Sequence, residues 1–236
     1  MKIFKAAQIR ELDSLQTAFE GISSYELMER AAGNMFRAIM EKHKERIRSK
    51  RITIFAGPGN NGGDALVLAR LLMENGVCDI SVHLINPKCS LSTDCTRAKE
   101  NLEKKYGHIL TETKTYAPVD LNGTDIIIDG LFGSGLNKAL DGGFAAVVKY
   151  INASPAMVIS IDIPSGLMCE DNSYNISENI IKADTTLSLQ LPKLAFFLPE
   201  NQKYIGEWFC LDIRLSQQGQ DEAVSKYHVT TMDMIR

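Results

Sequence analysis

The chain has 236 residues, of which 44% are hydrophobic and 23% are charged, and its formal net charge at pH 7 is −3. This composition is typical of a globular protein with one large core or two small ones. The charge balance and the lack of a dense basic patch exclude nucleic-acid binding driven by phosphate contacts. No stretch is apolar enough for a membrane span, and the first residues turn charged too early for a signal peptide, so we expect a cytoplasmic protein without a membrane partner.

The cysteines and histidines offer no metal or disulfide framework. Five cysteines contain no C-x-x-C pair, and the odd number favours reduced thiols over a set of disulfides. The four histidines are scattered without zinc-ligand spacing.

The first strong pattern along the chain is a long helix over residues 22–43. Ser23 and Glu26 have the spacing of a capping box, in which each side chain binds the backbone of the other residue. An apolar stripe follows at helical intervals, and it predicts a face buried in the core: Leu27, Ala31, Met35 and Ile39.

A buried strand over residues 51–57 leads into the loop "GPGNNGGD" and then into a second helix. The glycines fit G-x-G-x-x-G between strand and helix, the setting of a dinucleotide-binding loop. The next strand, residues 79–88, ends in Asn86, Pro87 and Lys88, where a dehydrogenase would place a carboxylate for the ribose. No Lys-Ser or Lys-Thr pair follows the glycines, which disfavours a Walker loop as well.

Helices and strands then alternate to the end of the chain. Helices are predicted over residues 94–107 and 144–154, and strands over residues 125–130, 156–164, 183–191 and 207–215. Such alternation predicts an α/β fold: a three-layer α-β-α, Rossmann-like, doubly wound and mostly parallel sheet.

Polar residues gather in the loops that follow three of these strands. In a doubly wound sheet these loops meet at one edge, where ligands bind. Each residue alone is an ordinary turn former, but together with two glycine-rich loops they indicate a site. The residues are Asn61, Asp64, Asp129, Asp162 and Ser165.

Three stretches, "AGPGNNGGDALVLAR", "IDGLFGSGLNKAL" and "SIDIPSGL", carry a resemblance to a known family. In this order and spacing they resemble the YjeF N-terminal domain, the family of NAD(P)H-hydrate epimerases. The segments "GISSYELMERAAGNM" and "LPKLAFFLPENQKYIGEWFCLDIRL" are similar to it too, so the resemblance covers nearly the whole chain. One departure is Ala65, where the family often has glycine.

The resemblance implies a repair enzyme that interconverts the R and S epimers of hydrated NADH and NADPH (NADHX and NADPHX). It also implies a homodimer and one potassium ion per subunit, held by Asn61, Asp129 and Ser165. The substrate contacts that it implies are Asn60, Asn61, Gly62, Gly63, Asp64, Gly133, Ser134, Gly135, Leu136, Asn137, Lys138, Ala139 and Asp162.

The chemistry of these residue types agrees with that expectation. An amide oxygen, one carboxylate and a hydroxyl are hard donors that suit an alkali ion better than zinc or iron. Epimerisation needs an acid/base group at carbon 6 of the nicotinamide ring, and Asp162 is our first candidate. Lys88 is the second candidate, with a solvated surface lysine as the alternative interpretation.

Two further expectations concern the role of the domain and the extent of the chain. YjeF-like domains also resemble scaffold modules without catalysis, but a scaffold has no need of Asp129, Asp162 and the complete "NNGGD" loop, so we favour an enzyme. The end of the chain, "YHVTTMDMIR", resembles the join to a kinase-like dehydratase domain. We therefore expect an epimerase domain over residues 1–217, and a linker or the start of a further domain over residues 218–236.

Overall fold

The computed structural model of the chain describes residues 2–115 and 119–230. Within these residues, seven strands form one parallel sheet in the order β4-β3-β2-β5-β6-β7-β8. Their bounds are β2 Ile52–Ala56, β3 Ile80–Ile85, β4 Leu110–Thr113, β5 Ile126–Gly130, β6 Met157–Ile161, β7 Thr185–Leu189 and β8 Glu207–Leu211.

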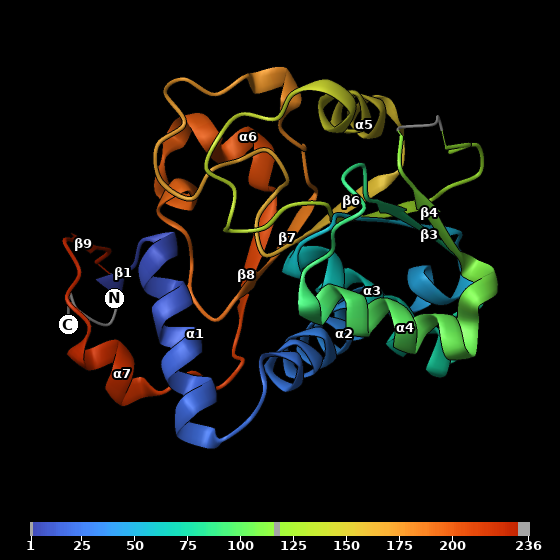
Figure 1. Cartoon of the computed structure of the whole chain (residues 1–236). Coiled ribbons are helices and arrows are strands. Elements are labelled where there is room, and N and C mark those ends of the chain that lie inside the picture. Colours follow the sequence, from blue (N-terminus) through green and yellow to red (C-terminus); the bar gives the residue numbers. More distant parts are fainter. Residues whose placement is uncertain (1, 116–118, 231–236) are drawn as a thin grey trace.

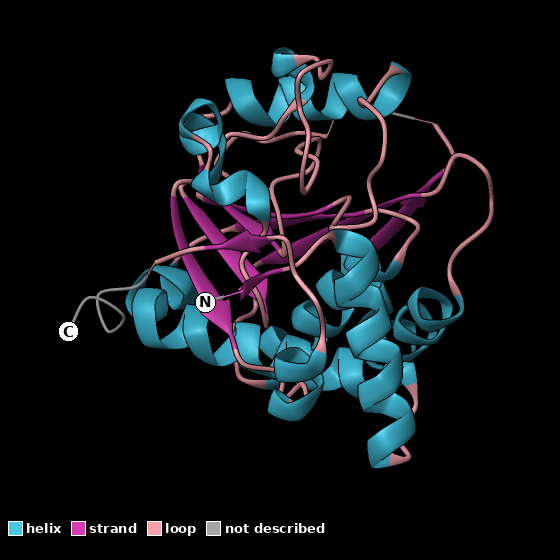
Figure 2. Ribbon diagram, turned by 90° about the vertical axis from the view of Figure 1, so that its left-hand side faces the viewer, coloured by secondary structure: helices cyan, strands magenta, loops and turns pink. Residues whose placement is uncertain are grey.

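Helices cover both faces of this sheet (Figures 1 and 2). The helices α2, α3 and α4 lie on one face, and α5 and α6 lie on the other (Figure 1). The α-helices are α1 Ala6–Glu20, α2 Ser24–Ser49, α3 Asn60–Glu74, α4 Thr93–Tyr106, α5 Gly142–Ala153, α6 Gln202–Ile205 and α7 Gln217–Glu222. Short 3-10 turns are η1 Gly107–Ile109, η2 Ser177–Asn179, η3 Leu194–Phe197 and η4 Pro199–Asn201. The predicted three-layer architecture is confirmed.

The alternating direction of side chains along the central strands explains how the sheet packs against a layer of helices on each face. In β2, Ile52, Ile54 and Ala56 belong to the core shared with α2, α3 and α4, whereas Phe55 belongs to the core shared with α5. Successive side chains of a strand point to opposite faces, and a strand covered on both faces is apolar throughout. All five residues of β2 are buried accordingly.

The predicted capping box at the start of α2 is also confirmed. Ser23 Oγ accepts a hydrogen bond from the backbone N–H of Glu26 at 3.2 Å, and the Glu26 carboxylate accepts one from the backbone N–H of Ser23 at 2.7 Å. The helix runs to Ser49, beyond the predicted end, although its backbone is non-helical at His43.

Several elements were not expected from the sequence: α1, β4, the short helices α6 and α7, the 3-10 turns, and a small antiparallel sheet of β1 Lys2–Ile3 with β9 Tyr227–His228. The Lys2 ammonium donates to the backbone carbonyls of Asp221 at 2.6 Å and Ala223 at 2.9 Å. The described part of the predicted linker therefore lies beside the chain start, next to α1 (Figure 1). The boundary at residue 217 stays a prediction, and residues 231–236 lie outside the described residues.

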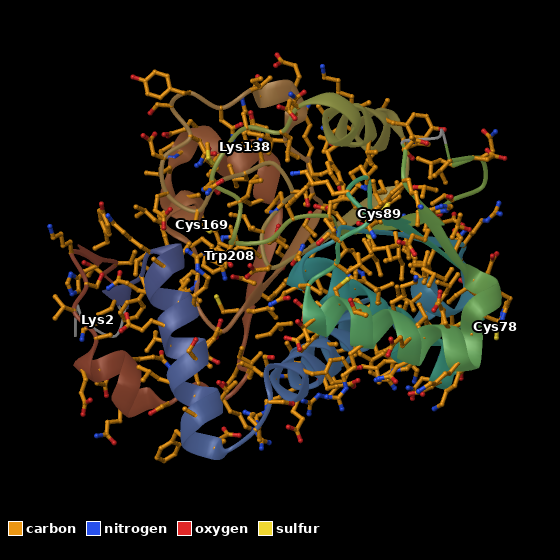
Figure 3. All side chains as sticks on the ribbon, in the orientation of Figure 1. Lys2, Cys78, Cys89, Lys138, Cys169 and Trp208 are labelled. Atoms are coloured by element: carbon orange, nitrogen blue, oxygen red, sulfur yellow. The ribbon has the colours of Figure 1, made fainter. Side chains whose placement is uncertain are left out.

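The cysteines lie apart and are free. Figure 3 shows Cys78, Cys89 and Cys169 in different parts of the molecule, and burial raises the pKa of Cys95 and of Cys169 to about 12. Among the described residues, no helix has both the length and the apolar character that a bilayer crossing requires.

Candidate active site

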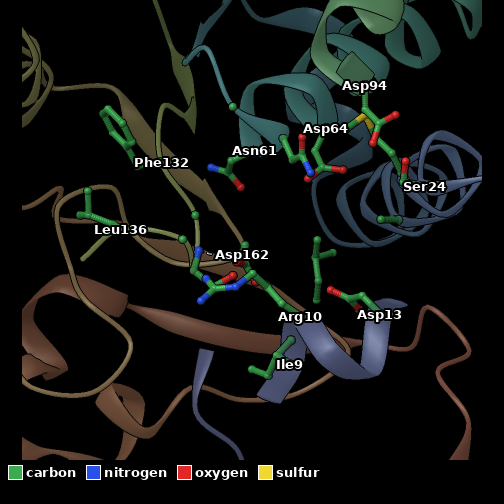
Figure 4. A pocket seen from close by; sticks show the side chains of 18 of the residues that line it. Ile9, Arg10, Asp13, Ser24, Asn61, Asp64, Asp94, Phe132, Leu136 and Asp162 are labelled. Atoms are coloured by element: carbon green, nitrogen blue, oxygen red, sulfur yellow. Dashed lines mark hydrogen bonds between the residues drawn. The ribbon is translucent and has the colours of Figure 1, made fainter. Parts of the chain in front are cut away.

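A cavity of about 760 Å³ opens where the order of the strands in the sheet reverses, between β2 and β5. The strands β3 and β4 lie on one side of β2, and β5 to β8 follow on the other. The loops after β2 and β5 diverge at this point, which is where doubly wound folds bind ligands. The cavity is lined by these two loops, by Asp162 after β6 and by the side of α1 (Figure 4).

Part of the glycine loop after β2 is packed closely against neighbouring backbone. A Cβ on Gly57 would lie 1.9 Å from the carbonyl oxygen of Leu131, and one on Gly62 would lie 1.8 Å from that of Gly57. Only glycine permits such an approach of one backbone to another. Gly62 and Gly63 are buried and do not line the cavity, whereas the predicted contacts Asn60, Asn61 and Asp64 do.

The loop after β5 supplies most of the second predicted set. Its residues from Leu131 to Lys138 line the cavity, and Ala139 does not. The cavity therefore contains these predicted contacts: Gly133, Ser134, Gly135, Leu136, Asn137 and Lys138.

Asp162 lines the cavity with an ordered and charged side chain. Its backbone has φ = 64°, a conformation that is uncommon outside glycine and typical of functional sites. One carboxylate oxygen lies 2.6 Å from the ammonium of Lys193, and the other accepts a hydrogen bond from the backbone N–H of Ser134 at 2.9 Å. Burial alone would raise the pKa of Asp162, but Lys193 and the hydrogen bonds lower it overall, so the group is ionised at neutral pH.

Lys193 was missed in the sequence analysis. Only 1% of this residue is exposed, and its ammonium also donates to Ser188 Oγ at 3.1 Å and to the backbone carbonyls of Leu189 and Leu191 at 3.2 and 3.0 Å. A lysine inside the apolar run "LPKLAFF" is the feature that marks it, because lysine is buried only with partners. The other candidate, Lys88, is exposed and does not line the cavity.

Asp129 lies behind the cavity wall with both oxygens occupied. It accepts hydrogen bonds from the hydroxyls of Ser165 and Ser160 at 2.5 and 2.8 Å, and from the backbone N–H groups of Ser165 and Leu131 at 2.9 and 3.3 Å. Burial raises the pKa of Asp129 more than these hydrogen bonds lower it. No described basic side chain forms a salt bridge with it, so its charge is balanced by dipoles alone.

The amide of Asn61 approaches the same segment. Its Nδ2 is buried and has no hydrogen-bond partner among the described residues. A Cβ on Gly133 would lie 2.9 Å from Asn61 Oδ1, and the neighbouring Phe132 N–H donates to Ser165 Oγ at 2.9 Å. The loop over residues 131–133 thus brings Asn61, Asp129 and Ser165 together. In the described parts of the chain, no group of three or more His, Cys, Asp or Glu side chains is arranged to hold a metal ion.

The remaining charged residues of the cavity are mostly acidic. Asp13, Asp64 and Asp94 line it, against the basic side chains of Arg10 and Lys138. Burial, and then the charges of Asp162, Asp13 and Asp94, raise the pKa of Asp64 well above its usual value. The cavity therefore combines an ionised carboxylate, Asp162, with Asp64, whose raised pKa favours the protonated form.

Comparison with known proteins assigns the chain to a family. The family model described as YjeF-related protein N-terminus matches residues 24–195. The chain belongs to this family. The crystal structure of the yeast protein ynu0 shares the YjeF-like fold seen here, with a TM-score of 0.76 at 20% identity, over 99% of this chain and 98% of that one.

Relatives of two lengths match this YjeF domain. The NAD(P)H-hydrate epimerase of Lentilactobacillus buchneri is 33% identical over 86% of this chain and 90% of its own length. The bifunctional NAD(P)H-hydrate repair enzymes Nnr of Dictyoglomus turgidum and Coxiella burnetii are 34% and 33% identical over 88% and 91% of this chain. The chain spans only 39% and 42% of the length of those bifunctional relatives.

Proposed function

We propose that this chain is an NAD(P)H-hydrate epimerase, which interconverts the R and S epimers of hydrated NADH and NADPH. The observation that carries the proposal is Asp162, held ionised by Lys193 at the edge of a cavity at the switch point of the sheet. The size of this cavity lies within the usual range for small-molecule sites. The names of the epimerase and Nnr relatives support the same activity.

The reaction makes modest demands on the protein. The C6–O bond breaks as the ring nitrogen donates its lone pair, the hydroxyl leaves with an added proton as water, and a planar iminium remains. Water then adds to the opposite face of carbon 6 and gives up a proton. The Asp162 carboxylate is placed to accept that proton, a contribution of roughly 10² to 10⁴ in rate.

The pyrophosphate of the dinucleotide has a binding surface at the start of α3. This helix of 15 residues begins at Asn60, beside the cavity. The free N–H groups of its first turn and the positive end of its dipole can therefore bind an anion there. Asn60 and Asn61 add amide groups at the same place.

Potassium is the cofactor that the residues fit. Asn61, Asp129 and Ser165 would hold it, because a carboxylate without a described basic partner, the side-chain oxygen of Asn61 and one hydroxyl lie around residues 131–133. The ion would supply a fixed positive charge that joins the three loops. A single carboxylate among neutral oxygens suits a monovalent cation.

The proposal also covers the location and the assembly of the protein. We include a cytoplasmic homodimer in the proposal, and pairing with an NAD(P)H-hydrate dehydratase domain, which the length and the name of the bifunctional relatives support. Sedimentation equilibrium of the purified chain tests the dimer, since a mass near 26.2 kDa would contradict it.

Separation of the two epimers by chromatography tests the activity. Pure S hydrate is incubated with the protein, and the R epimer is measured over time. Formation of R well above the spontaneous rate is the expected result. A rate equal to the spontaneous background contradicts an epimerase and favours a scaffold role for the domain.

A further inference from the structure

Helix α1 forms one wall of the cavity and carries a carboxylate that no motif had singled out. Arg10, Asp13, Ser14 and Thr17 line the cavity, and their spacing of three and four residues places them on one face of the helix. Figure 4 shows Asp13 and Asp162 entering the cavity from different walls, α1 and the loop after β6. The Asp13 side chain has no described hydrogen bond or ion pair, so it is available to a ligand.

The proposed epimerisation requires proton transfer on two faces of the ring. The hydroxyl leaves from one face with a proton, and water loses a proton as it adds to the other. A single carboxylate in a fixed position reaches one face, because a ring bound through its dinucleotide does not turn over between the two steps. A second proton-transfer group is therefore needed across the cavity from Asp162.

We propose that Asp13 is this second catalytic residue. The inference rests on the proposed function. For one epimer, the protonated Asp13 carboxyl donates its proton to the departing hydroxyl, and Asp162 takes a proton from the water that attacks the opposite face. For the other epimer the roles reverse, with Asp162 as the acid and Asp13 as the base. One proton is shared by the pair. Each turnover moves it from one carboxylate to the other, and proton exchange with water restores the starting form before the next turnover.

The electrostatic environments of the two carboxylates support this division. Burial and the charge of Asp162 raise the pKa of Asp13 to about 6, although Lys193 lowers it in part. The pKa of Asp162 is held down by Lys193. The other charged groups that line the cavity are Asp64 of α3, Asp94 of α4, Lys138 and Arg10 of α1 itself. Two carboxylates whose environments separate their pKa values are typical of an acid/base pair.

The experiment compares Asp13→Asn with Glu11→Gln, which removes a carboxylate from an exposed position of the same helix outside the cavity. The rate of S to R conversion is measured for both variants and for the wild type between pH 5 and 8, with the spontaneous rate subtracted. Circular dichroism and binding of NADH report whether each variant is folded with an intact site. Asp13→Glu is the second variant, because it restores a carboxyl group.

The expected result has two parts. Asp13→Asn lowers the rate by roughly 10² or more while NADH binding is retained, Glu11→Gln matches the wild type, and Asp13→Glu recovers part of the activity. In addition, kcat/KM of the wild type falls as pH rises above about 6, because Asp13 then loses the shared proton, and Asp13→Asn lacks this dependence.

Two results overturn the inference while the epimerase assignment stands. One is an Asp13→Asn rate within about threefold of the wild type, since loss of a general acid/base typically costs about 10² or more. The other is a lowered rate that keeps the same fall above pH 6. A wild-type protein without epimerase activity would instead reject the proposed function, and this inference with it.

Discussion

The two walls of the cavity differ in how tightly they are held. The first wall, called here the sheet-edge wall, consists of the loops at the carboxyl ends of β2, β5 and β6. In it, backbone packs directly against backbone, as at Gly57 and Gly62, and both oxygens of the buried Asp129 are hydrogen-bonded. On the α1 wall, the side chains of Arg10 and Asp13 have no described partners. The comparison indicates that the sheet edge fixes the geometry of the site, while α1 supplies groups that are free to meet a ligand.

Within the sheet-edge wall, we expect the largest loss of stability from removal of the Lys193 ammonium, which pairs with Asp162. Lys193→Met leaves a buried carboxylate without its counter-ion, so we expect the free energy of unfolding at pH 7 to fall by about 3–5 kcal/mol. The double variant Lys193→Met/Asp162→Asn has no such charge and recovers part of the loss. Urea unfolding of the two single variants and the double variant measures the coupling, and purely additive effects would contradict a direct pair.

The same pair predicts a dependence on pH with a definite sign. In the wild type the folded pKa of Asp162 is below its ordinary value of 3.8, so the pair stabilises the fold above that pH, and the contribution is lost as pH falls through the folded pKa. In Lys193→Met, burial instead raises that pKa, so the variant loses stability as pH rises. Its deficit against the wild type is therefore expected to be smaller at pH 4 than at pH 7.

A Cβ in the glycine loop tests the close backbone packing. We expect Gly62→Ala to lower the free energy of unfolding by about 3 kcal/mol, because its Cβ would overlap the carbonyl of Gly57. Gly33→Ala, in the middle of α2 with open space around it, is the matched control and should raise stability by about 0.5–1 kcal/mol. Equal and small effects at the two positions would show that the loop is not packed as described.

Exchange of potassium for tetramethylammonium tests the proposed ion in the sheet-edge wall. At ten times its Kd, an ion that binds only the folded state adds about 1.4 kcal/mol, so the melting temperature should fall by a few degrees on exchange. Asp129→Asn should remove the difference between the two salts. Identical melting temperatures for the wild type at matched ionic strength would speak against the site.

A change on the α1 wall should affect binding rather than folding. Arg10→Gln removes one of the basic side chains that line an otherwise acidic cavity, so we expect KM for the dinucleotide to rise about fivefold, or about 1 kcal/mol, with little change in kcat. Lys44→Gln, on an exposed position of α2 outside the cavity, is the charge-matched control. A fall in kcat with unchanged KM would mean that Arg10 acts on the reaction instead.

The two walls also differ in how far the sequence predicted them. Asn61, Asp129, Asp162 and Ser165 lie at the ends of strands or in the loops after them, so local pattern and the geometry of a parallel sheet were enough to bring them to one edge. The residues of α1 carry only an ordinary amphipathic pattern. Their place over the cavity depends on tertiary packing of Ile9 and Leu12 against α2 and the end of the chain, which no local pattern reports.

Lys88 and Lys193 also show what a local sequence pattern cannot predict. Lys88 follows a strand, but it is exposed outside the cavity, where the loop turns back as Asn86 accepts a hydrogen bond from the N–H of Ser90. Its catalytic role stays a prediction. Lys193 reaches Asp162 only because the segment after β7 folds over the sheet edge. A long-range ion pair is set by the whole fold, so the local sequence pattern did not indicate Lys193.

Substitution of Asp162 tests the central claim most directly, because the proposed chemistry depends on its carboxylate. The rate of S to R conversion and the affinity for NADH are measured for the wild type and for Asp162→Asn, which keeps the shape of the side chain. We predict a rate lower by roughly 10² or more with far less change in affinity, since the substitution leaves the proposed pyrophosphate site at the start of α3 unchanged. A variant that interconverts the epimers at nearly the wild-type rate would contradict the account.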